Sequence, residues 1–262
     1  MIRNINNSLQ IKDRDDENRL LHIILDVGEA LMGYGAEVSR VEDTMSRIAK
    51  AYGAVEVDVM AITASIMLTV RFKGGHECTQ TRRMKSVAGN DFTKFDAINT
   101  LSRAVCRNPV PLNQLDQRVT AIIKAKNNWV ADLAGYLLVG AGFGVFFGGN
   151  LWDVILSTIG SLIIFTCQIY LAPFCMNTIV FNLIASLITG FCIYPTAVFL
   201  PAANPDVVLI SDIMLLIPGL AMTNAVRDII LGDTIAGLMR LIETFLWATA
   251  LAIGFLAIMV LL

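Results

Sequence analysis

The second half of the chain, residues 129–262, is almost free of charge, and no other feature constrains the fold as strongly. The chain holds 20 Lys+Arg and 22 Asp+Glu, of which this half contains only 2 and 7. Its apolar runs are about 20 residues long, the length that a helix needs to cross roughly 30 Å of hydrocarbon. A soluble domain would not collect its charges in one half of the chain. The sequence therefore predicts a transmembrane helical domain over residues 129–262.

Five transmembrane helices are expected in this domain, because four short breaks divide the apolar sequence. The expected spans are 129–147, 151–172, 176–200, 207–226 and 235–262. Lys124 and Lys126 precede the first span, and Arg227 and Arg240 flank the last break. With five spans, all four stand on one side, and Lys and Arg favour the cytoplasmic side. The N-terminus is therefore expected in the cytoplasm and the C-terminus outside.

Small and acidic residues in these spans carry structural expectations. Gly140, Gly144 and Gly148 recur every four residues, a spacing typical of closely packed membrane helices. Asp132 and Asp153 lie near span ends, and we interpret them as hydrated.

Residues 1–128 predict a small cytoplasmic α+β domain. The polar N-terminal segment has no apolar core, so no signal peptide is expected. Ser39 and Glu42 have capping-box spacing, although Ala36 and Glu37 could already be helical. The periodicities predict helices near 17–31, 36–52, 91–107 and 115–126, and strands near 55–59, 66–72 and 77–84, with a hairpin turn at 73–76.

The sequence does not indicate a catalytic site or a metal site. The five cysteines contain no CxxC pair, and two histidines are too few for a histidine metal cluster. We therefore expect no metal, no cofactor and no enzymatic activity. The basic cluster of Arg82, Arg83 and Lys85 could contact phosphates, but a solvated edge is the favoured interpretation, and no nucleic-acid partner is expected.

The apolar run from Ile210 to Glu243 is interrupted by Pro218-Gly219, where a membrane helix tolerates a break least. Pro218 has no N–H, and its ring clashes with the carbonyl of Met214, so the span should break there. A half-helix starting at Pro218 would point its positive end at the bilayer centre, which suits a carboxylate. A packing kink without a ligand is an equally weighted interpretation.

One helical face of this run would hold Asp212, Gly219, Thr223 and Arg227, which could line a path. Arg227 and Asp228 could instead form an interfacial anchor pair.

Three pieces of the chain match one known family in order and spacing. The first is GYGAEVSRVEDTMSRIAKAYGAVEV at Gly33–Val57, and the second is the strand from Ser65 with the later TRRMK. The third and most specific is IPGLAMTNAVRDIILGDTIAGLMR at Ile217–Arg240. With these pieces the chain resembles the threonine/serine exporter (ThrE) family, in particular its N-terminal half as found in YjjP-like split-exporter subunits.

The resemblance implies an exporter of the bacterial inner (cytoplasmic) membrane that is linked to the proton-motive force. It implies threonine and serine as substrates of fused members and succinate for split members. Because the sequence ends at Leu262, it also implies a separate YjjB-like (ThrE C-terminal-half-like) membrane subunit and a hetero- or homo-oligomer. The alternative is a regulatory or structural subunit with the transport pathway in the partner.

The resemblance also implies functional positions. The substrate or gating positions it carries over are Pro218, Gly219, Asn224, Arg227, Asp228, Gly232, Asp233, Gly237 and Arg240. Those in the soluble domain are Gly35, Glu37, Arg40 and Glu42. Asp212 is added from its own chemistry, because a protonatable carboxylate inside a span could couple transport to protons, as could Glu243.

Overall fold

The computed structural model describes residues 14–84 and 91–261. The polar N-terminal segment and Lys85 of the basic cluster lie outside these residues. The described chain divides into two compact units. The first holds the residues up to Lys126 together with Leu220–Leu241, and the second holds Asn127–Gly219 and the residues from Ile242 onward. The chain thus passes between the units three times.

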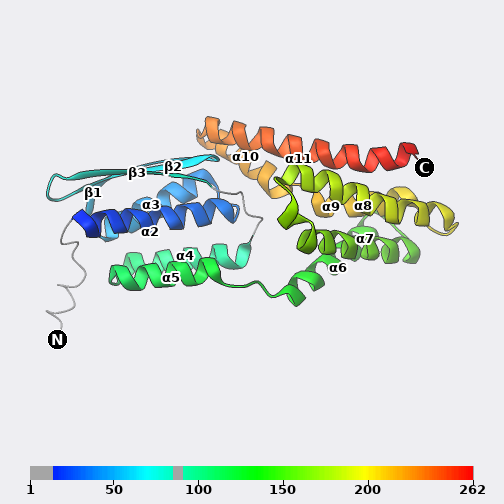
Figure 1. Ribbon diagram of the computed structural model, residues 1–262, viewed down its shortest axis with the longest axis horizontal. Helices are drawn as coiled ribbons and strands as arrows, with labels where there is room; N and C mark the ends of the chain where they lie inside the picture. The colour runs from blue at the N-terminus through cyan, green and yellow to red at the C-terminus, as the bar shows by residue number, and fades with distance from the viewer. Residues whose placement is uncertain (1–13, 85–90, 262) are drawn as a thin grey trace. The chain divides into compact units, whose positions relative to one another are not determined.

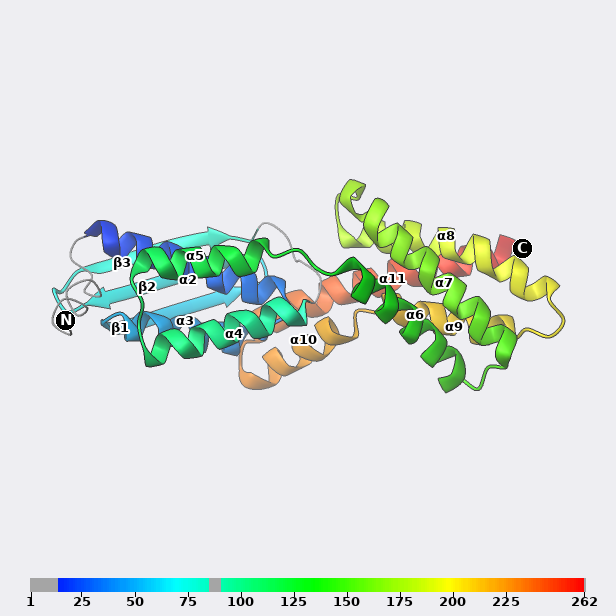
Figure 2. The same ribbon diagram turned by 90° about the horizontal axis from the view of Figure 1, so that it is seen from below.

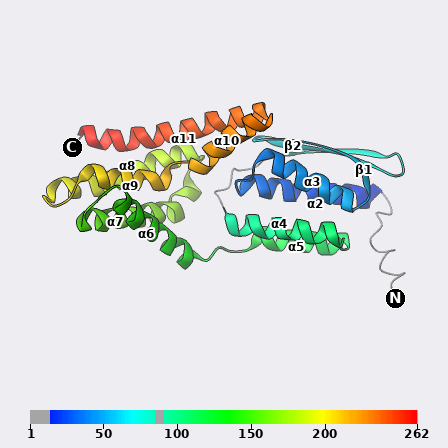
Figure 3. The ribbon, with the colours of Figure 1, turned by 180° about the vertical axis from the view of Figure 1, so that it is seen from behind.

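The first unit consists of a small sheet and two layers of helices (Figures 1 and 3). Its N-terminal part contains α2 (Arg14–Gly33), α3 (Val38–Ala51), β1 (Ala54–Ile62), β2 (Ser65–Phe72), β3 (Glu77–Arg83), α4 (Phe92–Arg107) and α5 (Leu112–Lys124). Helices α2 and α3 cover one face of the sheet, and α4 and α5 pack on the other side of these two helices. The expected α+β domain is confirmed.

The sheet is antiparallel in the order β1-β2-β3, with β2 at its centre (Figure 2). Ile66, Leu68 and Val70 alternate along β2 and are fully buried, as the period of two predicted. They pack in one hydrophobic core with Leu20 and Ile24 of α2, which lie on the predicted helical stripe. The apolar pattern therefore places both layers correctly.

The second unit is a helical bundle of α6 (Trp129–Phe146), α7 (Leu151–Tyr170), a 3₁₀ turn (Ala172–Phe174), α8 (Thr178–Phe199), α9 (Pro205–Leu216) and the later part of α11 (Thr234–Leu261). Within the described residues, four helices are long and apolar enough to cross a membrane: α6, α7, α8 and α11. A fifth crossing exists if α9 and the next helix, α10 (Gly219–Leu231), form one broken span. The chain therefore has the expected class of a multi-pass membrane protein.

Close packing of α6 on α7 depends on two of the predicted glycines. A Cβ on Gly140 would lie 2.6 Å from the Ser161 hydroxyl oxygen, and one on Gly144 would lie 3.1 Å from the Val154 Cα. Gly148 instead stands in the following turn, with a φ of 77°.

The interpretation of Asp153 as hydrated is wrong. The residue is 1% exposed, and its carboxylate accepts hydrogen bonds from the backbone N–H groups of Asn150 at 2.8 Å and Asn204 at 2.6 Å. It therefore ties the start of α7 to the loop before α9. Asp132 is exposed, as expected.

The helix is interrupted at Pro218, as expected, but the helix that follows the interruption is longer than expected. Helix α9 ends at Leu216 and α10 begins at Gly219, so that Ile217 and Pro218 are not helical. Helix α10 continues through Arg227 to Leu231, past the predicted end of the span at residue 226. Arg227 and Asp228, which suggested a loop, therefore lie on a helix, whereas Asp233 lies in the turn before α11.

Candidate functional site

The turn between α2 and α3 carries the first half of the candidate site. Gly35 has a φ of 90°, which side chains with a Cβ rarely adopt. The N–H of Ala36 donates to Leu31 O at 2.9 Å and that of Gly35 to Met32 O at 3.2 Å, the Schellman pattern of a helix end. The turn itself does not satisfy the carbonyls of Gly35 and Ala36, the carboxylate of Glu37 or the N–H of Val38. Other parts of the chain provide partners for these groups.

Helices α10 and α11 satisfy all four of these residues. The Asn224 side chain donates to the Gly35 carbonyl at 2.8 Å, and the Arg240 guanidinium donates to the Ala36 carbonyl at 3.3 Å. Two further contacts complete the set: Arg227 forms an ion pair with Glu37, and the Val38 N–H donates to the Asp228 carboxylate at 3.1 Å. We call this set of contacts, between residues 35–38 and Asn224, Arg227, Asp228 and Arg240, the turn clamp.

A buried ion pair forms the centre of the turn clamp. Asp228 and Arg240 are 3.0 Å apart, and their side chains are 0% and 10% exposed. The second carboxylate oxygen of Asp228 accepts from the first free N–H of α3. Asp228 therefore caps a helix that lies 190 positions earlier in the chain.

The predicted capping box of Ser39 and Glu42 is absent, because α3 begins at Val38 and its N-cap is Glu37, with no side-chain cap of its own. The Glu42 carboxylate instead accepts from the Ala61 N–H at 2.9 Å. Burial raises the pKa of Glu42, the Ala61 hydrogen bond opposes this rise, and Asp233 and Asp228 add to it.

Three further predicted positions shape the hairpin between α10 and α11. Gly232 has a φ of 102°, and the Asp233 N–H donates to Asp228 O at 2.9 Å, so α10 also ends in a Schellman turn. A Cβ on Gly237 would lie 2.6 to 2.9 Å from Ala225 O and from two atoms of Ile229. Gly237 thus allows α11 to approach α10 closely enough for Arg240 to reach Asp228.

The remaining predicted positions do not join the turn clamp. Asp212, Pro218 and Gly219 belong to the second unit. Because the helix is interrupted after Leu216, the single helical face expected for Asp212, Gly219, Thr223 and Arg227 does not exist as one continuous surface.

Arg40 also lies outside the clamp. Its guanidinium stands over the Phe95 ring of α4, 5.4 Å from the ring centroid.

Asp212 of α9 is a buried acidic residue of the bundle. It is fully buried, and neither carboxylate oxygen has a hydrogen-bond partner among the described residues. Its carboxylate occupies the space that a Cβ on Gly160 of α7 would need. The hydroxyls of Ser157 and Ser161, on the same helix as Gly160, donate to carbonyls of that helix. A carboxylate in such a place requires a proton or a cation.

Sequence reasoning missed the roles of Ala36 and Val38, which act through their backbone groups. No side-chain type marks such residues. The one available signal was that the segments 33–57 and 217–240 both resemble the same family, and this does not indicate that they touch. Their contact was not foreseen.

The turn clamp provides charge pairing and hydrogen bonding between the turn at residues 35–38 and helices α10 and α11. It contains one buried and one more exposed ion pair, a helix cap and two donors to carbonyls, with no nucleophile beside a base. Among the described residues, no group of three or more His, Cys, Asp or Glu is arranged to hold a metal ion. Together these polar contacts hold the α10–α11 hairpin on the turn at residues 35–38.

Comparison with known proteins gives one match. A family model, ThrE, described as "Putative threonine/serine exporter", matches residues 22–262. No curated protein and no solved structure matches the chain.

Proposed function

We propose, from the premise that the chain belongs to the ThrE family of threonine/serine exporters, that it is one subunit of an inner-membrane exporter of small carboxylate-bearing metabolites. The family and the apolar helices make the chain a multi-pass membrane transporter. In the proposal, the substrate is a succinate-like dicarboxylate or threonine/serine. Export is linked to the proton-motive force, and a YjjB-like membrane subunit completes the pathway.

The turn clamp is the observation that carries this proposal. Four consecutive residues, 35–38, are each held by a polar side chain of the segment that best resembles the family. Helix α10 is joined to α9 by only Ile217 and Pro218. A change in the clamp is therefore transmitted along the chain to a helix of the bundle. We assign Arg227, Asp228 and Arg240 to a gate on the cytoplasmic side.

Asp212 provides the proposed link to protons. Its buried carboxylate has no hydrogen-bond partner among the described residues, and it lies against Gly160 of α7. Uptake and release of a proton there changes the charge inside the bundle, which alters the packing of α9 against α7. In this proposal the break at Ile217 and Pro218, which joins α9 to α10, acts as the hinge next to Asp212.

A regulatory or structural subunit is the second candidate function. It is favoured by the location of the turn clamp, which lies wholly in the unit that contains the α+β domain. In that case the pathway would lie in the partner. Buried polar residues of the bundle, such as Asp212 and Asn182, would then be replaceable by apolar residues without loss of export.

The proposal is tested in proteoliposomes that contain this chain with and without the partner subunit. Labelled succinate and labelled threonine are followed under an imposed proton gradient. We expect transport of one substrate class, and only with the partner present. Transport by this chain alone would show a complete pathway in one subunit, and no transport in either case would favour the regulatory function.

Two variants test the gate within the same assay. Arg227→Ala and Asp228→Asn should abolish export when the rate is expressed per folded protein in the membrane. The matched control is Arg19→Ala, which breaks an ion pair with Asp116 in which both side chains are about half exposed, 45% and 41%. Export retained in both gate variants would remove these residues from the mechanism.

A further inference from the structure

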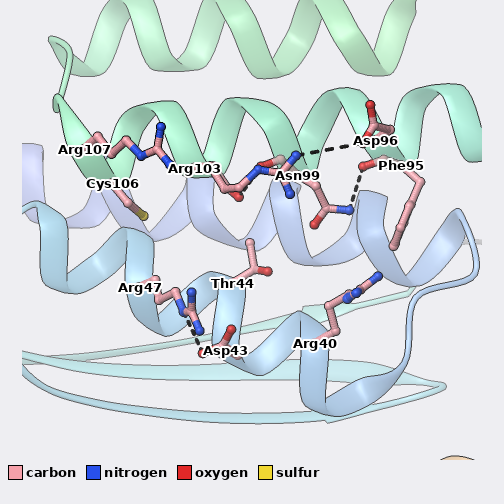
Figure 4. A pocket seen from close by; sticks show the side chains of 11 residues that line it. Arg40, Asp43, Thr44, Arg47, Phe95, Asp96, Asn99, Arg103, Cys106 and Arg107 are labelled. Carbon is pink, nitrogen blue, oxygen red and sulfur yellow. Dashed lines mark hydrogen bonds and ion pairs between the residues drawn. The ribbon is translucent and has the colours of Figure 1, made fainter.

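A groove between α3 and α4 in the first unit collects four arginines, and neither the family match nor the turn clamp explains it. Arg40 and Arg47 come from α3, and Arg103 and Arg107 come from α4 (Figure 4). The groove has a volume of about 580 Å³. Sites for small molecules typically measure about 300 to 1,000 Å³. We call this region the arginine groove.

The charges in the arginine groove do not balance. Two aspartates line it: Asp43 pairs with Arg47 at 2.8 Å, and Asp96 lies 3.9 Å from Arg103. No carboxylate among the described residues lies within ion-pair distance of Arg40 or Arg107. The groove therefore keeps two positive charges, and one of them, on Arg40, lies over the ring of Phe95.

Donor groups from both helices lie along the groove. Arg40 and Phe95 stand at one end of it and Arg107 at the other, with Asn99 and Arg103 between them (Figure 4). Guanidinium groups match the geometry of carboxylates and phosphates, to which they donate paired hydrogen bonds. A ligand that contacts more than one of these arginines needs at least two anionic groups.

We propose that the arginine groove binds a small soluble organic anion that carries two or more carboxylate or phosphate groups. The bound anion bridges α3 and α4 and neutralises the excess positive charge between them. Helix α3 also begins at Val38, whose N–H is held by Asp228 in the turn clamp. The ligand therefore acts on the same rigid helix that the clamp holds, which makes the groove a regulatory site.

The test measures binding and not transport, so its result does not depend on whether the proposed function is correct. The full-length chain is placed in nanodiscs of zwitterionic lipid and titrated calorimetrically with citrate, pyrophosphate, succinate and threonine. Citrate, pyrophosphate and succinate, each with two or more anionic groups, should bind, and threonine, with no net charge, should not. Arg40→Gln and Arg107→Gln should each weaken binding by about tenfold, since each removes a charge-assisted contact.

The matched control is Arg83→Gln, which removes an exposed arginine on β3, outside the groove. This variant should bind as the unmodified chain does. Equal weakening in Arg83→Gln would show non-specific attraction, and absence of citrate and pyrophosphate binding would overturn the proposal. A further titration uses vesicles of anionic lipid in place of the small anions. If the chain bound only these vesicles, and Arg40→Gln abolished that binding, the groove would be a site for lipid headgroups and the proposal would be wrong.

Cys106 offers a second readout inside the groove. It lines the groove and is half-buried, and burial raises the pKa of its thiol, with Arg47 opposing this rise and Asp43 adding to it. The thiolate is the reactive form, so its alkylation should accelerate as the pH rises from 7 toward and above 9. Citrate should slow the alkylation of Cys106 but not that of Cys78. Equal rates at Cys106 with and without citrate would contradict occupancy of the groove.

Discussion

At the scale of single residues, Asp228 and Arg240 contribute more to the site than any other pair. Asp228 is fully buried; its carboxylate pairs with the Arg240 guanidinium and accepts a hydrogen bond from the first N–H of α3, that of Val38. Removing one partner of a buried pair leaves an uncompensated charge, which is far more destabilising than losing an exposed pair. The structural and the functional contributions of this pair can therefore be separated by single and double substitutions.

We expect Asp228→Ala to lower the free energy of unfolding by about 3 to 5 kcal/mol, because Arg240 stays buried without its partner. Asp116→Ala, which breaks the exposed pair with Arg19, should cost less than about 1 kcal/mol. Equilibrium unfolding of the purified chain in detergent measures both. The double variant Asp228→Leu with Arg240→Met should recover most of the stability. If it also recovered export, the pair would be structural only.

Asp212 supports a second prediction at this scale. Asp212→Asn keeps the shape of the side chain but cannot exchange a proton. Export in proteoliposomes should then lose its dependence on the imposed proton gradient, while the chain remains folded. Asp206→Asn, which changes an exposed carboxylate on the same helix, is the matched control and should leave that dependence intact. An unaltered gradient dependence in Asp212→Asn would exclude Asp212 as the coupling residue.

At the scale of helices and strands, the local sequence was enough to predict the strand β2, the hairpin turn after it and the helix break at Pro218. Alternation placed β2 because Ile66, Leu68 and Val70 all face one core, and Gly74 and Gly75 allowed the hairpin turn to be predicted. The break at Pro218 followed from the missing N–H. These features need no knowledge of distant residues.

The turn clamp could not be predicted in the same way, because its partners lie about 190 positions apart. Charges at 227 and 228 indicated a loop at a membrane edge, since a helix in lipid does not tolerate them. Here they are satisfied by the turn at residues 35–38, so α10 continues to Leu231. The spacing of Ser39 and Glu42 was misleading for the same reason, because Asp228 supplies the cap.

The contact of α10 with α11 gives a prediction about elements. In Gly237→Ala the new Cβ meets backbone atoms of α10, so the helices must separate, at a cost of about 1 to 3 kcal/mol. Hydrogen exchange at the Val38 amide should increase, because Asp228 moves with α10. In Gly219→Ala nothing lies within 4 Å of the new Cβ, and stability should change by less than about 1 kcal/mol. Equal losses in the two variants would contradict this packing.

At the scale of the whole molecule, the number of membrane crossings follows from chain connectivity. Helices α6, α7 and α8 are each long enough to cross, and if all three cross, the end of α8 lies on the side opposite the α+β domain. Helix α10 and the first turns of α11 nevertheless belong to the same unit as that domain. The chain must therefore return between α8 and α10.

Helix α9 cannot make this return alone. Its 12 residues rise about 18 Å, which is less than the roughly 30 Å of a hydrocarbon core. The break at Ile217 and Pro218 and the beginning of α10 must complete the crossing. We infer that residues 205–231 form one broken span and that α11 then crosses once more.

This connectivity predicts opposite sides for the two ends of the chain. With the N-terminus in the cytoplasm, where Lys124 and Lys126 favour it, alkaline phosphatase fused after Asn204 or Leu261 should be active, because it reaches the outside. The same enzyme fused after Asp233 should be inactive, and green fluorescent protein at that position should fluoresce. If residues 205–231 were a re-entrant loop, the fusions after Asn204 and Asp233 would report the same side. The turn clamp would then be unable to form, because Arg240 and the turn at residues 35–38 would be separated by the bilayer.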